Sequence, residues 1–196
     1  MKRWIVSGLA SALMSLPAWA ALQAGDAAPD FTLQASLNGK AFAYSLKTQL
    51  QKGPVVVYFY PSAYTGGCNI QARTFALNAD KFAAAGASVI GVSLDSIERL
   101  NKFSADPEYC AGKVAVASDA KGEVSRAFAL NVAERAGRKD TRGEDIDHAF
   151  VERTTFILTP DGKVAATVGG LPPAANVEQT LSVVQSLKGR TAPAAN

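Results

Sequence analysis

The sequence has few of the residues that build metal sites and dithiol motifs. Its 196 residues include two cysteines and one histidine. That is too few for a dedicated Cys/His zinc cage, which takes four such ligands. Cys68 is followed by Asn-Ile-Gln71, so no Cys-x-x-Cys pair is present. Such a pair is the usual motif of thiol–disulfide carriers. We therefore expect neither a metal nor a bound cofactor.

Long hydrophobic runs are also scarce, and the one at the N-terminus has the form of a secretory leader. Residues 1–3 include two basic side chains, about 13 mostly apolar residues follow, and Ala18-Trp-Ala20 fits a small-x-small cleavage site. A retained anchor is the weaker alternative, because a bilayer span needs about 20 apolar residues. The sequence predicts a signal peptide over 1–20, a periplasmic mature protein without stable membrane association, and a location that permits disulfides.

The predicted mature chain has almost no excess charge of either sign. The whole sequence has 20 Lys+Arg and 17 Asp+Glu, and removal of Lys2 and Arg3 leaves 18 against 17, or +1. A near-neutral chain gives no electrostatic reason to expect nucleic acid as a partner. Its length and 48% hydrophobic content fit one globular domain. We expect this domain over 21–189 and a flexible tail over 190–196.

Strand-like and helix-like segments alternate along the chain, which predicts an α/β domain with a mixed sheet. An N-terminal β-hairpin is expected around the turn Asn38-Gly39. Residues 55–60 form an unbroken apolar run typical of a central strand covered on both faces. The other expected elements are a second hairpin over 154–168, strands over 88–94 and 114–117, and helices over 68–85, 96–105, 122–130 and 174–187.

A charged segment over 134–147 stands apart from this alternation. Nine of its side chains carry charge: Glu134, Arg135, Arg138, Lys139, Asp140, Arg142, Glu144, Asp145 and Asp147. A solvated loop is the simpler interpretation, and a partner-docking loop is the alternative. The single histidine, His148, follows directly, and we expect it to be a polar or partly buried structural residue rather than the partner of a catalytic thiol.

Cys68 has the sequence context of a reactive thiol. It lies after a predicted buried strand and a turn, in the first turn of a predicted helix. A helix N-terminus offers free N–H groups and about half a positive charge, both of which favour the thiolate. Pro61 ends the strand, Thr65 offers a hydroxyl, and Gly66 and Gly67 let the backbone approach a small molecule. The segment predicts a pocket for a small polar molecule beside a thiolate.

The pattern Pro-x-x-x-Thr-x-x-Cys after a strand resembles the active-site loop of the peroxiredoxins. The resemblance covers most of the mature chain and is nearest to the bacterioferritin-comigratory, or PrxQ-like, branch. It implies a thioredoxin-like α/β fold with a central mixed β-sheet flanked by helices, and a thiol-dependent peroxidase activity. The further matching segments are Gly25-Asp-x-Ala-Pro29-Asp-Phe31-x-Leu33, Ile90-Gly-Val-Ser-Leu-Asp95, Ser118-Asp119 with Gly122, and Arg153-Thr-Thr-Phe-Ile-Leu-x-Pro-Asp-Gly162-Lys-Val.

Carried over by position, the resemblance implies a role for each residue of the loop. Cys68 attacks hydrogen peroxide or an organic hydroperoxide and becomes a sulfenic acid. Pro61 shields the sulfur from water, and Thr65 hydrogen-bonds the peroxide and the thiolate. Arg153 holds the thiolate and polarises the peroxide. The N–H groups of Gly67 and Cys68, with the Arg153 guanidinium, are expected to stabilise charge on the leaving oxygen.

Cys110, the second cysteine, has three open roles. It follows the predicted 96–105 helix, in a loop or frayed helix end whose mobility would bring its Cα within about 7 Å of a partner cysteine. The resemblance implies that it resolves the Cys68 sulfenic acid as an intramolecular disulfide, which a thioredoxin-like reductant then reduces. An incidental Cys110 in a one-cysteine enzyme and a disulfide between subunits are the alternatives. The chain departs from relatives at Gln71, where many have Glu, and at Arg73, where some have the resolving cysteine.

Two other functions compete with a peroxidase. One is a thiol–disulfide carrier of the same fold, and the other is a non-enzymatic module stapled by a Cys68–Cys110 disulfide. A staple would not require the arrangement of Pro61, Thr65 and Arg153. The expected partners are a peroxide and a thioredoxin-like reductant. We expect a monomer or a homodimer, with exposed apolar loops near Tyr64 as a candidate dimer face.

Overall fold

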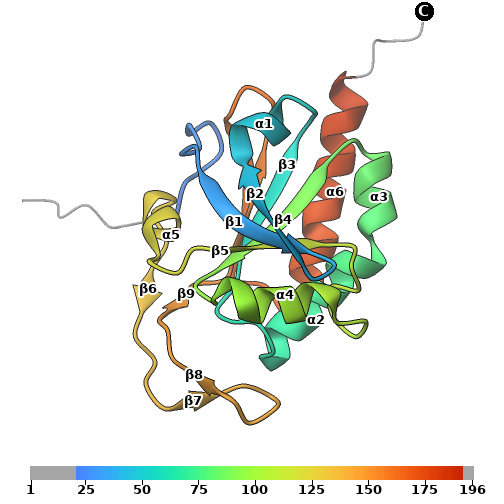
Figure 1. The fold of residues 1–196 in the computed structure, drawn as a ribbon. Helices are drawn as coiled ribbons and strands as arrows, with labels where there is room; N and C mark the ends of the chain where they lie inside the picture. Colours follow the sequence, from blue (N-terminus) through green and yellow to red (C-terminus); the bar gives the residue numbers. More distant parts are fainter. Residues whose placement is uncertain (1–20, 192–196) are drawn as a thin grey trace, which may run out of the picture.

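The structure, a computed structural model, describes residues 21–191, and the predicted leader lies outside the described residues. Seven strands form one sheet in the order β11-β10-β3-β4-β5-β1-β2 (Figure 1). The pairs β3–β4 and β4–β5 are parallel and the other pairs are antiparallel, so the predicted mixed sheet is confirmed. The strands are β1 (Thr32–Leu37), β2 (Lys40–Ser45), β3 (Val55–Phe59), β4 (Ser88–Ser93), β5 (Ala115–Ser118), β10 (Thr154–Leu158) and β11 (Val164–Gly169).

Helices cover both faces of this sheet. They are α1 (Leu46–Leu50), α2 (Gly66–Leu77), α3 (Ala79–Ala84), α4 (Ile97–Ala105), α5 (Glu123–Ala127) and α6 (Pro173–Thr191). Alternate residues of β3 point to opposite faces. Val56 and Tyr58 pack in one buried cluster with side chains of α2, α3, α4 and α6. Val57 and Phe59 pack in a second cluster with side chains of α1 and with Phe128 after α5. The central strand is therefore buried on both sides, as its apolar run predicts.

The N-terminal hairpin forms through its predicted turn. Asn38 and Gly39 have φ angles of 50° and 75°, the left-handed conformations that a tight two-residue hairpin turn requires. Strands β1 and β2 pair in register from Thr32 opposite Ser45 to Leu37 opposite Lys40. The second predicted hairpin, β10–β11, also forms.

The prediction of one helix over 68–85 is wrong at its start and in the middle, whereas its end is right to within one residue. The helix begins two residues earlier, at Gly66, and it is interrupted at Asn78, which has φ −105° and ψ 8°. The Asn78 side-chain amide donates to the Thr74 carbonyl over 2.9 Å. This local bond favours a non-helical backbone at Asn78, and the chain restarts there as α3.

Two other helices differ from their predicted lengths. Helix α5 ends at Ala127, three residues early, and Ala129 takes a positive φ of 57° that ends any helical continuation. Helix α6 continues past Gly189 to Thr191, so the first two residues of the expected tail are helical. Residues 192–196 lie outside the described part. No helix within 21–191 is long and apolar enough to cross a membrane.

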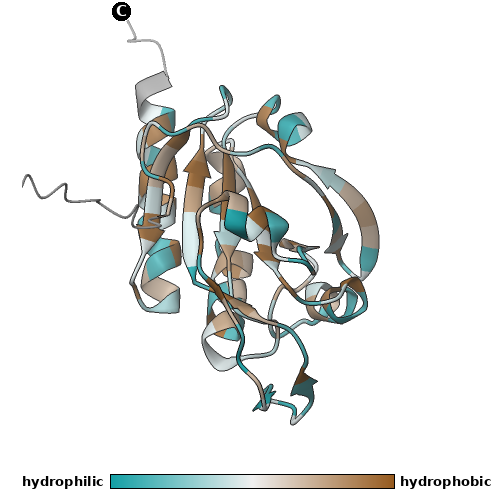
Figure 2. Cartoon of the chain, turned by 90° about the vertical axis from the view of Figure 1, so that its left-hand side faces the viewer, coloured by the Kyte–Doolittle hydropathy of each residue, from teal (hydrophilic) through white to brown (hydrophobic). Residues whose placement is uncertain are grey.

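The charged segment contains a small hairpin, in which β7 (Arg138–Lys139) pairs with β8 (Asp145–Ile146). The residues on either side of the segment also pair, as β6 (Val132–Ala133) with β9 (Phe150–Val151). Figure 1 shows the β7–β8 hairpin reaching away from the sheet, on the side where α2 begins. The residues of this hairpin are largely hydrophilic, in contrast to the apolar residues of the sheet strands (Figure 2).

The register of the sheet determines which residues lie at the edge where β3 and β4 end, next to the start of α2. Strand β10 runs antiparallel to β3 with Thr154 opposite Phe59. Arg153 therefore lies beside the segment that leaves β3 and leads to α2. Because β4 runs parallel to β3, Asp95 just after β4 lies at this same edge. The sheet thus brings Arg153, Asp95 and the segment after β3 together at the start of α2.

Candidate active site

Cys68 lies in the first turn of α2 with its sulfur beside a guanidinium. The residue is only 2% exposed. The Nη2 N–H of Arg153 donates to Cys68 Sγ over 3.2 Å. Thr65 is the N-cap residue of α2, so the N–H groups of the next three residues have no partner within the helix. A cation and a helix N-terminus therefore both favour negative charge on this sulfur.

Thr65 has its hydroxyl fixed by the preceding turn. Its Oγ1 donates to the Ser62 carbonyl over 2.8 Å, and its side chain makes no capping bond to α2. A hydroxyl that donates its one hydrogen bond in this way still has lone pairs that can accept a hydrogen bond. In this conformation the Thr65 hydroxyl can accept a hydrogen bond from a donor in the pocket. The hydroxyl does not donate to Cys68, which differs from the role that the resemblance implied toward the thiolate.

A pocket of about 350 Å³ opens at Cys68. The loop before α2 and the β10 edge contribute Pro61, Thr65, Gly66, Cys68 and Arg153 to its lining. The remaining lining residues come from the charged segment and the strand after it: Arg138, Lys139, Asp140, Thr141, Ile146 and Phe150. The structure thus brings together Pro61, Thr65, Cys68 and Arg153, and it adds a wall that the sequence did not indicate.

Gly67 has a different position from the one expected of it. Gly66, not Gly67, lines the pocket. A Cβ on Gly67 would lie 3.2 Å from Arg153 Nη2 and 3.3 Å from Pro173 Cγ. The missing side chain at Gly67 therefore leaves room for the Arg153 guanidinium above the start of α2.

A chain of amides orients Arg153 from behind. Arg153 Nη1 donates to Gln71 Oε1. Gln71 Nε2 donates to Asn176 Oδ1 over 3.0 Å, and Asn176 Nδ2 donates to the Val168 carbonyl over 3.0 Å. Gln71 and Asn176 are fully buried. A neutral amide at position 71 positions the guanidinium without neutralising it, so the charge of Arg153 stays available to Cys68.

Asp95 anchors the loop before α2 from the other side. Its carboxylate accepts from the Ser62 hydroxyl and from the Ala63 backbone N–H, each over 2.7 Å. His148 Nε2 lies 2.9 Å from the same carboxylate. Burial alone would raise the pKa of Asp95, yet these hydrogen bonds hold it below the usual value. Burial likewise opposes protonation of His148, but Asp95 raises the His148 pKa above its ordinary value.

Ser62, His148 and Asp95 do not form a hydrolytic triad. In a triad, one histidine nitrogen faces the serine and the other faces the carboxylate. Here the same nitrogen, Nε2, faces both Ser62 Oγ at 3.4 Å and Asp95 Oδ1 at 2.9 Å. The Ser62 side chain is also fully buried. This cluster therefore holds the loop in place, and His148 is the partly buried structural residue that was expected.

The charged segment packs against the loop at Tyr64. Thr141 donates to the Tyr64 carbonyl from its backbone N–H over 2.9 Å and from its hydroxyl over 2.8 Å. The Arg142 guanidinium carbon lies 3.3 Å from the centre of the Tyr64 ring. Asp140, with a fully buried side chain, accepts from Arg99 Nη2 over 2.7 Å. Most of 134–147 is exposed, as the solvated-loop interpretation predicts, but the segment also forms a wall of the Cys68 pocket, which neither interpretation included.

Tyr64 is not part of an exposed apolar surface. It is 2% exposed, and its ring packs edge-on against Phe103 and Tyr109 at centroid distances of 5.0 and 5.6 Å. Its φ of 60° is uncommon for a residue with a side chain. The bonds from Thr141 and the aromatic packing hold this conformation. The expectation of exposed apolar loops at Tyr64 is wrong, because the charged segment covers this residue.

Cys110 occupies the predicted loop after α4, but its thiol is inaccessible. The residue is 0% exposed and packs in the same buried cluster as Tyr58, Tyr60 and Phe103. Burial raises the pKa of the Cys110 thiol, and nearby Asp106 adds to this effect. The loop itself is ordered by backbone bonds within 104–113. The frayed, mobile segment expected at Cys110 is therefore a closed turn in this structure.

The two cysteines are separate free thiols, and Cys110 does not line the pocket.

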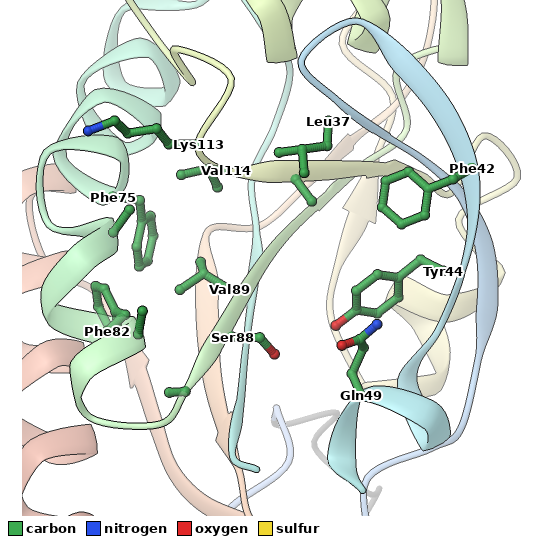
Figure 3. A pocket seen from close by; sticks show the side chains of 14 residues that line it. Leu37, Phe42, Tyr44, Gln49, Phe75, Phe82, Ser88, Val89, Lys113 and Val114 are labelled. Atoms are coloured by element: carbon green, nitrogen blue, oxygen red, sulfur yellow. The ribbon is translucent and has the colours of Figure 1, made fainter. Parts of the chain in front are cut away.

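A larger apolar groove of about 440 Å³ lies between the β1–β2 hairpin and α2–α3. Figure 3 shows Phe42 and Tyr44 on one side of this groove and Phe75 and Phe82 on the other. Neither cysteine lines this groove. Within residues 21–191 no three His, Cys, Asp or Glu side chains gather as a metal site.

Sequence reasoning missed the residues that support the site from behind. These supports acquire their roles only through the register of the sheet and the docking of the hairpin. They are Ser62, Asp95, Arg99, Asn176 and the residues of the pocket wall. Asp95 had a weak signal, because it ends the strand pattern that carried the resemblance. The others are ordinary polar residues in the sequence.

Comparison with known proteins agrees with this geometry. A sequence profile of the AhpC/TSA family matches residues 24–167. Peroxiredoxin Bcp of Escherichia coli is 34% identical over 143 residues, which are 73% of this chain and 83% of that protein. The crystal structure of peroxidoxin BcpB from Mycobacterium tuberculosis superposes with a TM-score of 0.71 at 29% identity, covering 85% of this chain and 98% of that one. The bacterioferritin comigratory protein of Xanthomonas campestris gives 0.63 at 27% identity, covering 80% and 92%.

Proposed function

The chain belongs to the AhpC/TSA family and is a thiol-dependent peroxidase of the peroxiredoxin type, and from this premise we propose that Cys68 is its peroxidatic nucleophile. The observation that carries the proposal is the 3.2 Å contact between Arg153 Nη2 and Cys68 Sγ. It supports a thiolate at the base of a pocket large enough for a peroxide. Thr65 and Pro61 complete that pocket.

In the first step, the Cys68 thiolate attacks one oxygen of the peroxide. The S–O bond forms as the O–O bond breaks, so the sulfur is oxidised to a sulfenic acid and the peroxide is reduced. The other oxygen leaves as hydroxide or alkoxide and takes a proton to become water or an alcohol. Arg153 and the free N–H groups at the start of α2 stabilise the charge that develops on this oxygen. Thr65 accepts from the peroxide O–H and thereby orients it.

In the second step, Cys110 resolves the sulfenic acid. Its thiolate attacks the sulfur of Cys68, a disulfide forms, and the sulfenic oxygen leaves as water after protonation. Because the Cys110 thiol is buried, its loop must leave the aromatic cluster before this step. A thioredoxin-like dithiol then reduces the disulfide by exchange, which returns both thiols and leaves the dithiol oxidised.

The substrates of the reaction are hydrogen peroxide or organic hydroperoxides. The Xanthomonas campestris protein has an alkyl peroxide reduction activity. The pocket volume of about 350 Å³ is more than ten times the volume of about 30 Å³ that one water occupies in the liquid. This room supports organic hydroperoxides as well as hydrogen peroxide.

Export to the periplasm is the further part of the proposal. Its support is the sequence of residues 1–20, with basic, apolar and small-x-small parts in order. The N-terminal sequence of protein recovered from a periplasmic fraction tests it. A start at Ala21 supports export, and an intact Met1 in a cytoplasmic fraction contradicts it.

The decisive experiment adds one equivalent of hydrogen peroxide to the reduced mature protein and follows peroxide loss and intact mass. We expect rapid loss and an internal disulfide. The Cys110→Ser variant should still consume peroxide but stop at a Cys68 sulfenic acid. The Cys68→Ser variant should consume none. A sulfenic acid in the wild type would mean a one-cysteine enzyme, and no peroxide loss would refute the proposal.

A further inference from the structure

The wall of the Cys68 pocket that the β7–β8 hairpin supplies carries two cations. Arg138 and Lys139 line the pocket, and both residues are exposed. Lys139 Nζ pairs with Asp145 at 2.6 Å, with both side chains well exposed to water. Within residues 21–191 Arg138 forms no ion pair or hydrogen bond through its side chain. The pocket therefore has at least one guanidinium at its mouth without a counterion.

The one acidic residue of this lining is already matched. The Asp140 carboxylate accepts from Arg99 at 2.7 Å and from Arg142 at 2.8 Å, and neither arginine lines the pocket. Its side chain is fully buried beneath the hairpin. Of the cations, Arg153 faces Cys68. This leaves Arg138, which has no counterion, and Lys139, whose exposed pair with Asp145 can exchange partners, to act on anything that extends outward from the sulfur.

The same pocket has an apolar side. Ile146 is buried, and Phe150 and Pro61 are partly buried, along its lining. Hydrogen peroxide would fill only a small part of the volume. A molecule that fits such a space has a reactive end at Cys68, an apolar body against Ile146 and Phe150, and a negative group near the hairpin.

The backbone that carries the cations is anchored rather than being a loose loop. Thr141 anchors the hairpin to the Tyr64 carbonyl, and Asp140 anchors it to Arg99. The distance between the sulfur and the cationic rim, the part of the hairpin that carries Arg138 and Lys139, is therefore set by the fold. A fixed rim selects among substrates by their charge, whereas a mobile one would adapt to any of them.

We infer that Arg138 and Lys139 are specificity-determining residues that favour hydroperoxides bearing a carboxylate over neutral hydroperoxides of the same shape. This inference rests on the proposed function, because it concerns the same pocket and the same reaction at Cys68. The carboxylate takes no part in the bond changes. It increases the occupancy of the pocket by the substrate that reacts with the thiolate.

The test compares cumene hydroperoxide carrying a para-carboxylate with its methyl ester. The two share the reacting group and the apolar ring and differ in charge at neutral pH. The readout is the second-order rate constant for Cys68 oxidation, from quenched samples and intact mass. We expect the acid to react about two- to fivefold faster in the wild type, the effect of one additional exposed ion pair. The ratio should shrink as salt is added.

Three variants assign this preference to the hairpin. Arg138→Gln with Lys139→Gln should bring the acid-to-ester ratio to about one, and Arg138→Lys should keep the preference. Lys40→Gln with Lys52→Gln removes the same total charge from exposed positions elsewhere and should leave the ratio unchanged. Circular dichroism compares the fold of each.

A wild-type ratio near one, with normal oxidation by hydrogen peroxide, would overturn the inference and leave the proposed function intact. A ratio that falls equally in the Lys40/Lys52 control would also overturn it, because net charge rather than the rim would then be responsible. Failure of hydrogen peroxide to oxidise Cys68 at all would refute the proposed function, and the inference with it.

Discussion

The two cysteines lie in the same buried cluster, yet their surroundings differ in nearly every physical respect. Cys68 has a guanidinium at 3.2 Å, a helix N-terminus and a pocket in front of it. Cys110 has aromatic neighbours and a pKa raised by burial. A thiol reacts through its thiolate, so only the first is set to react in this conformation. The comparison teaches that neighbouring charge and access, more than burial itself, separate a reactive thiol from an inert one.

The largest expected effect comes from removing the reactive member of the pair. Cys68→Ser should lower peroxide reduction by more than about a thousandfold, since no nucleophile remains. Cys110→Ser should leave the rate of the first oxidation within about twofold of wild type. Single-turnover peroxide consumption measures both. Equal losses in the two variants would contradict the difference drawn here between the cysteines.

The next effect comes from making Cys68 more like Cys110. Arg153→Gln removes the cation at the sulfur and should lower the rate of Cys68 oxidation by about 10² to 10³, as loss of an oxyanion-type donor does. Arg153→Lys should recover part of the rate, because it restores the charge without the planar fork. The pH dependence of thiol alkylation in each variant is the accompanying measurement, and a profile equal to wild type in Arg153→Gln would refute the role.

A smaller effect comes from loosening the cover of Cys110. Arg73 on α2 donates to the Pro107 carbonyl over 3.0 Å and so ties α2 to the Cys110 loop. Arg73→Ala should speed disulfide formation after oxidation by about two- to fivefold, since one exposed hydrogen bond is lost. Arg126→Ala is the matched control, because Arg126 makes the same kind of bond to the Lys121 carbonyl elsewhere. Equal rates in both variants and the wild type would show that Arg73 does not restrain the loop.

The smallest effect concerns the polar support behind the Cys68 loop. His148 has a raised pKa in the folded chain, so its protonated form binds Asp95 and stabilises the fold. That contribution is complete below the unfolded histidine pKa of about 6.5 and is lost as pH rises through the higher folded value. Asp95 has a lowered pKa and stays ionised throughout.

Urea unfolding midpoints at about pH 6 and about pH 8 measure this dependence. We expect the wild-type midpoint to fall as pH rises, and His148→Gln to lose most of that fall, because His148 is the only histidine in the sequence. A midpoint that rises with pH in the wild type would show that the His148–Asp95 pair has the opposite linkage.

Much of the fold could be predicted because short sequence patterns indicate its strands. The apolar run at 55–60, the turn Asn38-Gly39 and the alternation of elements are each local signals. The break at Asn78 could not be predicted from helical spacing, since it depends on one side-chain bond to Thr74. The closing of the Cys110 loop depends on aromatic packing contributed by β3, α4 and the loop before α2.

The site was predictable only where its residues share one motif. Pro61, Thr65 and Cys68 lie on one loop, and the resemblance named Arg153. The polar supports could not be anticipated, because Asp95 and Asn176 reach the site through sheet register and helix docking. The part that the charged segment plays in the pocket wall was missed for the same reason. Its charges suggest solvent, whereas its buried Asp140 and its bond to the Tyr64 carbonyl are tertiary features.

Arg99 belongs to α4, but its guanidinium binds partners from the other two segments around the pocket. Its Nη2 atom donates to the Ala63 carbonyl over 3.0 Å and to Asp140 over 2.7 Å. Because one side chain joins the first turn of α4, the loop before α2 and the β7–β8 hairpin, we expect the three to open together as one unit in hydrogen exchange. On this view the substrate-facing wall of the pocket lasts for as long as the first turn of α4 stays folded, so the stability of one helical turn limits how long the pocket keeps its shape.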